Sequence, residues 1–178
     1  MRRVLAITFI VFLALLVTSA ARASELRVTV TDVRSNTGEL LIGLYETSDG
    51  FVKAIANAET SGIMADRNRL VGVAMRARTG TQLAVFAQLP PGQYAVIVVH
   101  DENDDGRLDA NAFGVPIEGY GFSNDARGFL SAPTFDATAI TIGDSDASIA
   151  ISLTYPPPSS FEVETDIDRL FGDSTPKK

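Results

Sequence analysis

Hydrophobic and polar residues alternate in seven separate stretches of the chain, which is the pattern of strands that bury one face. In the first stretch, Leu26, Val28 and Val30 alternate with an arginine and two threonines. The stretch from Tyr94 to Val99 is apolar on both faces, which is typical of a central strand. The expected strands cover residues 26–31, 39–45, 71–77, 83–89, 94–99, 134–142 and 148–155.

Turn residues between these stretches predict how the strands connect. Asn36-Thr37-Gly38, Thr79-Gly80 and Gly143-Asp144 each separate two consecutive strands, so three hairpins are expected. Seven short strands with hardly any helical pattern predict an all-β fold. The expected architecture is a seven-stranded antiparallel β-sandwich of immunoglobulin-like type, with a long acidic, glycine-rich and aromatic-rich loop.

One short helix is expected after the second strand, where the alternation fails. Phe51, Ile55 and Ala58 would share one face of a helix that begins at Ser48 or Asp49. The rest of the segment as far as Arg69 has no clear periodicity, and it yields no further element.

The two ends of the chain differ from its middle. Arg2 and Arg3 precede an apolar run, and Ala21-Arg22-Ala23 has small residues at a cleavage spacing, so residues 1–23 are expected to be a signal peptide. The apolar run is shorter than the roughly 20 residues of a membrane span, so no membrane insertion is expected after cleavage. Residues 24–155 form the expected sandwich, and residues 156–178 a proline-led acidic tail that docks as a short helix or is disordered.

The net charge of the chain narrows the classes of molecule that it is expected to bind. The chain carries 15 basic and 22 acidic residues and a net charge of −7, which becomes −10 after cleavage because three arginines are lost. Such a surface argues against nucleic acid and anionic membranes as partners. We expect a periplasmic or secreted monomer with a protein or glycan partner. The absence of cysteine agrees with a domain large enough to fold without disulfides.

The segment after His100 matches the spacing of a calcium-binding loop. Oxygen ligands recur at alternate positions, and a glycine at position 106 permits a sharp bend. Hard oxygen ligands favour Ca²⁺ over zinc or copper. The bidentate glutamate of an EF-hand is replaced by Ala112, so Glu118 or Asn111 would complete the shell. The alternative is a solvated turn in which Asp and Asn bond their own backbone. The expected ligands are Asp101, Asn103, Asp105, the carbonyl of Arg107, Asp109 and Glu118.

The next stretch is unusual for a surface connection because it combines three aromatic residues with several glycines. Phe113, Tyr120 and Phe122 are expected to form a ligand or partner surface, since aromatic rings give a large contact area with few rotors to freeze. The alternative is a loop that packs these rings against the edge of the sandwich.

An enzymatic function finds little support in the residues. His100 is the only histidine, and it is followed by Asp101, with Ser123 downstream. No Gly-x-Ser-x-Gly motif is present, and adjacent strand residues point to opposite faces. We therefore expect a structural histidine and a non-catalytic protein, with a hydrolase as the minor alternative. That alternative requires His100 to face a cleft.

Three motifs in sequence carry a family resemblance. Leu89-Pro90-Pro91-Gly92-Gln93-Tyr94, the acidic segment 100–109 and the stretch 114–124 occur in this order. In these motifs the chain resembles the bacterial family called domain of unknown function 2141. The resemblance covers roughly residues 26–155, and it implies an exported protein of Gram-negative bacteria whose activity is not established.

A more distant resemblance concerns the Leu-Pro-Pro-Gly-x-Tyr motif followed by an acidic loop. It is similar to transthyretin-like sandwiches, including the B-type repeats of bacterial surface adhesins, in which comparable loops bind calcium. This resemblance implies Asp101, Asn103, Asp105 and Asp109 as ligands, although the long connection 113–133 departs from those repeats. The transthyretin-related hydrolases share the architecture, but their several active-site histidines are absent here.

Overall fold

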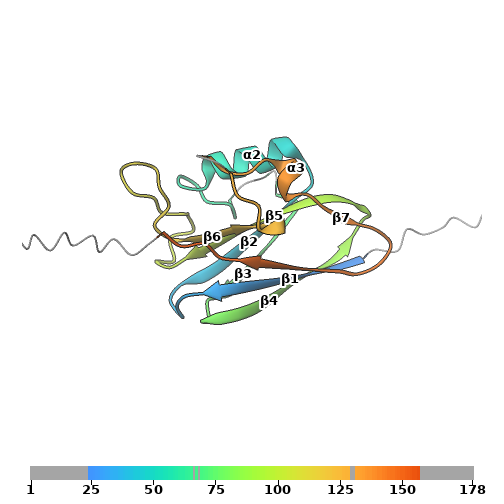
Figure 1. Ribbon diagram of the computed structural model, residues 1–178, viewed down its shortest axis with the longest axis horizontal. Coiled ribbons are helices and arrows are strands. Elements are labelled where there is room, and N and C mark those ends of the chain that lie inside the picture. Colours follow the sequence, from blue (N-terminus) through green and yellow to red (C-terminus); the bar gives the residue numbers. More distant parts are fainter. Residues whose placement is uncertain (1–23, 66, 68, 129–130, 157–178) are drawn as a thin grey trace, which may run out of the picture.

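The computed structural model describes residues 24–156 apart from 66, 68, 129 and 130, and Figure 1 shows their arrangement. The expected signal peptide and acidic tail lie outside the described residues and stay predictions. The elements are β1 (Ser24–Val33), β2 (Glu39–Tyr45), α2 (Ser48–Asn57), β3 (Val71–Arg76), β4 (Gly80–Leu89), β5 (Gly92–Asp101), β6 (Gly119–Phe122), η1 (Ser123–Asp125), α3 (Phe135–Thr138), β7 (Ile140–Ile142) and β8 (Ala147–Ser152).

Two sheets pack face to face and confirm the predicted β-sandwich. One sheet has the strand order β4-β1-β8, and the other has the order β3-β2-β5-β6 with β7 paired to β5. The helices α2 and α3 lie over the outer face of the second sheet, so the molecule has three layers (Figure 1). No helix of the described residues covers the outer face of the first sheet.

The second sheet is buried on both faces, because successive side chains of a strand point to opposite faces and both sets are apolar here. In β2, Leu40, Ile42 and Leu44 face the first sheet, while Leu41 and Tyr45 face the helices. In β5 all residues from 94 to 101 are buried. This agrees with the central strand predicted from its two apolar faces.

The helix α2 confirms the helix expected after the second strand. Its N-cap is Thr47, whose side chain accepts a hydrogen bond from the Gly50 amide at 3.1 Å, one residue before the predicted start. Phe51 and Ala58 are buried in the cluster under the helix, with Ile55 packed against them. The apolar spacing therefore identified the correct face of the helix.

The predicted hairpins are wrong, because the two strands of each predicted hairpin lie in different sheets. β1 belongs to the first sheet and β2 to the second, while β3 belongs to the second and β4 to the first. β7 pairs with β5, and β8 pairs with β1 in parallel, so the sandwich is not wholly antiparallel. Alternation marks which face of a strand is buried, but it does not reveal which sheet the strand joins.

The described residues form eight strands rather than seven, and the stretch 134–142 is only partly a strand. Its first half is the short helix α3, because the Thr134 side chain accepts a hydrogen bond from the Ala137 amide at 3.3 Å. Only Ile140–Ile142 is extended as β7. The additional strand is Gly119–Phe122, β6, which lies within the predicted long loop.

Candidate functional site

The acidic loop, residues 101–109, leaves the end of β5 and curls around a buried carboxylate. Asp101 is only 2 % exposed, and its two oxygens accept hydrogen bonds from the amides of Asp105 (3.1 Å) and Gly106 (2.6 Å). Gly106 has a φ of 82°, in the left-handed region that favours glycine. The predicted bend at this glycine is therefore present.

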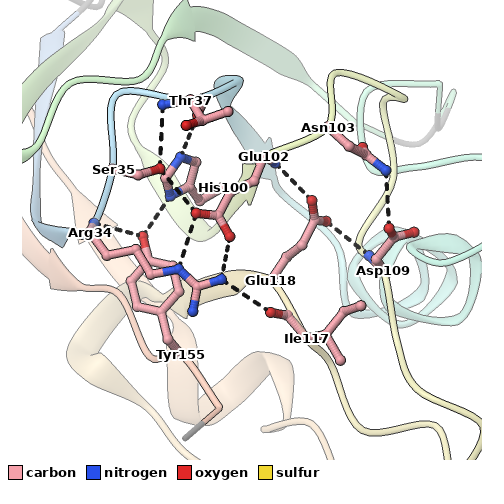
Figure 2. Close-up of polar contacts among 10 residues, drawn as sticks. All are labelled: Arg34, Ser35, Thr37, His100, Glu102, Asn103, Asp109, Ile117, Glu118 and Tyr155. Carbon is pink, nitrogen blue, oxygen red and sulfur yellow. Dashed lines mark hydrogen bonds and ion pairs between the residues drawn. The ribbon is translucent and has the colours of Figure 1, made fainter. Parts of the chain in front are cut away.

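The other oxygen side chains of the acidic loop also take hydrogen bonds within it. Asn103 accepts from the amide of Asp105 and donates to Asp109 at 3.1 Å (Figure 2). The Asp105 carboxylate accepts from the amide of Arg107 at 2.9 Å. These are the local backbone contacts of the solvated-turn alternative.

Glu118 folds back onto the acidic loop and connects its two ends. The side chain is 4 % exposed, and its oxygens accept from the amides of Glu102 (2.7 Å) and Asp109 (2.9 Å), as Figure 2 shows. Burial raises the pKa of Glu118, and the nearby charges of Asp101 and Asp109 raise it further, while the two backbone hydrogen bonds oppose this. The site therefore holds several carboxylates at close range.

The structure thus places the predicted ligands in or beside the acidic loop, but they do not surround a common point where a metal ion could bind. Among the described residues, no three carboxylate or imidazole groups converge as ligands of one ion. The ion pairs found in the described part of the chain do not include Asp101, Asp109 or Glu118. Each bonded carboxylate oxygen keeps a second lone pair, so a cation could still compensate the charge of these three groups.

A second polar cluster lies beside the acidic loop and was not predicted. Arg34 forms an ion pair with Glu102, and its guanidinium carbon lies 4.4 Å from the centre of the Tyr155 ring (Figure 2). Hydrogen bonds from Arg34 and Ser35 lower the pKa of Glu102 against the effect of burial. Arg34 and Glu102 are 68 residues apart, so no local spacing could reveal the contact.

His100 belongs to the protein interior. It is fully buried, and its ring nitrogens contact the Tyr155 hydroxyl at 2.6 Å and the Thr37 carbonyl oxygen at 2.9 Å (Figure 2). Ser123 is also buried, donates to the Thr138 carbonyl and accepts from the amide of Val96. The hydrolase alternative required His100 to face a cleft, and this requirement is not met.

The acidic loop continues into a short projecting segment, which we call the aromatic tip, residues 111–117 (Figure 1). The Asn111 side chain accepts hydrogen bonds from the amides of Phe113 (2.9 Å) and Val115 (3.1 Å), and Ala110 pairs with Pro116. Phe113 is 91 % exposed. The tip is therefore an ordered turn that presents an apolar ring to solvent.

The three predicted aromatic residues lie at different depths. Phe113 is exposed, Tyr120 is partly buried, and Phe122 is buried beneath the helices at 8 % exposure. The Phe122 ring lies edge-on to Phe51, with ring centres 6.1 Å apart. The expectation of a surface made by all three rings is thus wrong for Phe122, which packs in the core.

All three aromatic residues nevertheless border one concave region of about 630 Å³, which we call the aromatic groove. The residues around it come from the aromatic tip, the end of α2, the strands β5 and β6, and the segments 125–128 and 131–133. The described residues around it include Ile55, Ala58, Glu59, Ile63, Ile97, Val99, Leu108, Phe113, Val115, Pro116, Tyr120, Phe122, Asp125, Arg127, Ser152 and Thr154.

The acidic loop is attached directly to the wall of the aromatic groove. The amide of Leu108 donates to the carbonyl of Ala58, at the end of α2, at 3.0 Å. Gly62 has a φ of 75°, and a side chain there would meet the Gly106 carbonyl oxygen at 1.7 Å. The position of the tip therefore depends on the fold of the acidic loop.

Comparison with known proteins places the chain in a bacterial family without an established activity. Residues 28–150 match the family described as "Uncharacterized protein conserved in bacteria (DUF2141)", which confirms the predicted resemblance. No curated protein matches the sequence.

Two solved structures are similar to this chain at low sequence identity. The pilus-presented adhesin Spy0125 (Cpa) is 16% identical with a TM-score of 0.29, and the match covers 78% of this chain and 28% of the adhesin. The T6SS lipoprotein TssJ1 from Pseudomonas aeruginosa is 13% identical with a TM-score of 0.34, over 76% of this chain and 98% of the lipoprotein.

Proposed function

The chain belongs to the DUF2141 family of uncharacterized bacterial proteins, and we propose that it is an exported, non-catalytic module that binds a partner in the aromatic groove. The observation that carries this proposal is the groove of about 630 Å³ beside the exposed ring of Phe113. Binding clefts usually have volumes of roughly 300–1,000 Å³, apolar walls and a few polar groups.

The walls favour an apolar segment of a protein as the partner. The partly exposed or exposed side chains of Ile55, Leu108 and Val115 offer no hydrogen bonds, so they suit apolar side chains better than hydroxyl groups. Phe113 and Tyr120 add aromatic surface to the border of the groove. A glycan that stacks on these rings is the alternative ligand.

The binding of a neutral apolar dye such as Nile red tests the groove. We expect one saturable site whose dissociation constant rises about tenfold in Phe113→Ala, because an exposed aromatic contact of this kind contributes more than about 1 kcal/mol. Val52→Ala is the matched control, since Val52 is exposed on α2 and does not border the groove. Equal effects of the two substitutions would contradict a site in the groove.

We also propose that Ca²⁺ binds the acidic loop and stabilises the wall of the groove. Support comes from the proximity of Asp101, Asp109 and Glu118, because burial raises the pKa of Glu118 and the charges of the two aspartates raise it further. The oxygen side chains of Asn103 and Asp105, with the carbonyl of Arg107, are the further ligands that the spacing suggests. Because the carboxylates do not converge in this structure, the loop has to tighten around the ion.

Thermal unfolding in EDTA and then in Ca²⁺ tests this part of the proposal. A site that is occupied at one hundred times its dissociation constant adds about 2.7 kcal/mol, which raises the midpoint by several degrees. Asp105→Asn/Asp109→Asn should abolish the shift. Asp136→Asn/Asp144→Asn, with the same loss of charge at exposed sites, should keep it. No shift in millimolar Ca²⁺ would reject the metal site.

The absence of catalysis is part of the proposal and rests on the buried contacts of His100 and Ser123. Export rests on the sequence pattern of residues 1–23. Within the described part of the chain, no helix is long and apolar enough to cross a membrane. The protein would act in the periplasm or outside the cell.

A further inference from the structure

The strand β4 forms a long, open edge of the first sheet. It has ten residues, and among the described strands it pairs only with β1. Figure 1 shows β4 as the outermost strand of its sheet. An edge of this kind presents a row of backbone N–H and C=O groups that another strand can use.

The other edges of the sandwich are shorter or covered. The opposite side is closed where Tyr120 of β6 pairs with Thr154, just after β8, and where the Ser152 amide donates to Asp125 at 2.8 Å. The edge strand β3 has six residues and ends in Arg76, which pairs with Asp104. In contrast, β4 contains no charged residue and no proline, which protect many edges, and its irregularity is confined to its ends, as at Gln88.

The solvent-facing side of β4 is also apolar. Leu83 is 52 % exposed and Val85 is 41 % exposed, and both lie on the outer face of the first sheet. Thr81 and Ala87 continue this row at either end, because side chains on one face recur at every second residue. The strand thus offers both an open backbone edge and an apolar side.

We propose that β4 pairs with β4 of a second copy, in antiparallel orientation about a two-fold axis. The two three-stranded sheets then become one continuous six-stranded sheet. A second copy fits because the row Thr81, Leu83, Val85 and Ala87 is nearly symmetric, so the same patch serves both partners. An edge without charge also lets two acidic chains meet there without direct like-charge contacts.

The register of the pairing follows from the strand. Gln88 has a left-handed φ of 61°, so the regular run ends at Ala87. Pairing of residues 81–87 with their counterparts places the axis at Ala84. Leu83 then lies opposite Val85 of the partner subunit, and the same contact occurs twice. This dimer departs from the monomer expected from the sequence.

The net charge gives the dimer a distinctive salt dependence. Both copies are acidic, so their long-range repulsion opposes association and is screened as the ionic strength rises. We therefore expect association to strengthen between about 0.05 M and 0.5 M NaCl. A partner held by opposite charges would show the reverse.

Sedimentation of the protein purified from an expressing bacterium tests the inference. We expect a concentration-dependent dimer whose dissociation constant rises at least about tenfold in Val85→Lys, because each introduced charge then lies opposite the apolar Leu83 of the partner subunit and diagonally across from the other introduced charge. Ser148→Lys is the control, since Ser148 is exposed on β8, two strands from the proposed contact. It should leave the dimer unchanged.

A mixture of the Val85→Lys and Leu83→Glu variants tests the register of the strand pairing. It also shows whether the variants are folded, because only folded chains can form the heterodimer. The proposed pairing places opposite charges together, so the mixture should form a heterodimer although each variant alone is monomeric. A wild type that stays monomeric up to about 1 mM in high salt would overturn the inference. So would an equal effect of Val85→Lys and Ser148→Lys.

Discussion

Replacement of Ser123 by alanine tests whether this residue is structural, as its contacts indicate. The hydroxyl of Ser123 is fully buried, donates to the Thr138 carbonyl at 2.5 Å and accepts from the Val96 amide at 3.0 Å. Ser123→Ala removes both contacts at once. One backbone acceptor and one backbone donor are then left buried without a partner.

The magnitude follows from these two groups. A buried backbone group that loses its partner costs about 1–3 kcal/mol, so we expect the loss of two such contacts in Ser123→Ala to lower the free energy of unfolding by about 2–6 kcal/mol. Entry of water into the space of the lost oxygen would bring the loss to the lower end of this range. The loss is a large fraction of the roughly 5–15 kcal/mol that stabilises a typical domain.

Urea unfolding is the appropriate assay, because the free energy of unfolding falls linearly with urea concentration. A change in the midpoint without a change in the slope of this line reports a change in stability alone. Ser148→Ala is the matched control, since Ser148 is an exposed strand residue and its replacement should change stability by less than about 0.5 kcal/mol. Equal stability of the two variants would refute the structural role assigned to Ser123.

Three further predictions concern the acidic loop and the helix beside it. Because the pKa of Glu118 is raised in the folded protein, this group adds stability that is complete below its ordinary pKa of 4.5 and is lost as the pH rises through the raised pKa. Glu118→Gln should therefore flatten the pH dependence of the free energy of unfolding measured from about pH 4 to 7. Gly62→Ala should lower the free energy of unfolding in urea by more than about 1 kcal/mol, because the added methyl group meets the Gly106 carbonyl and the backbone φ at this position is positive. Thr47→Ala should cost about 1 kcal/mol in the same assay, because the Gly50 amide loses its cap.

Much of the fold could be predicted because burial imposes a period on the sequence. The alternation in β1 and the two apolar faces of β5 identified strands that the structure contains. The spacing of Phe51, Ile55 and Ala58 identified the buried face of α2. The assignment of strands to sheets failed, because β1 and β4 pair only through contacts between residues distant in sequence.

The sequence predicted only those contacts of the candidate site that join residues close together in the chain. Oxygen side chains at alternate positions indicated the curl around Asp101, and the structure brings Glu118 back to the loop as expected. The ion pair of Arg34 with Glu102 joins distant segments and leaves no pattern in the sequence. The burial of Phe122 was likewise hidden, because a glycine-rich stretch with aromatic residues gives no sign that it contains the strand β6.

The groove is the central claim, and its most direct test is binding to arrays of peptides and glycans. The account predicts a ligand, richest in apolar side chains, that the wild type and Val52→Ala bind equally well and Phe113→Ala binds about tenfold more weakly. Val52 and Phe113 are both exposed, so the comparison isolates the groove. A ligand that Phe113→Ala binds as tightly as the wild type would place the binding site elsewhere and contradict the account.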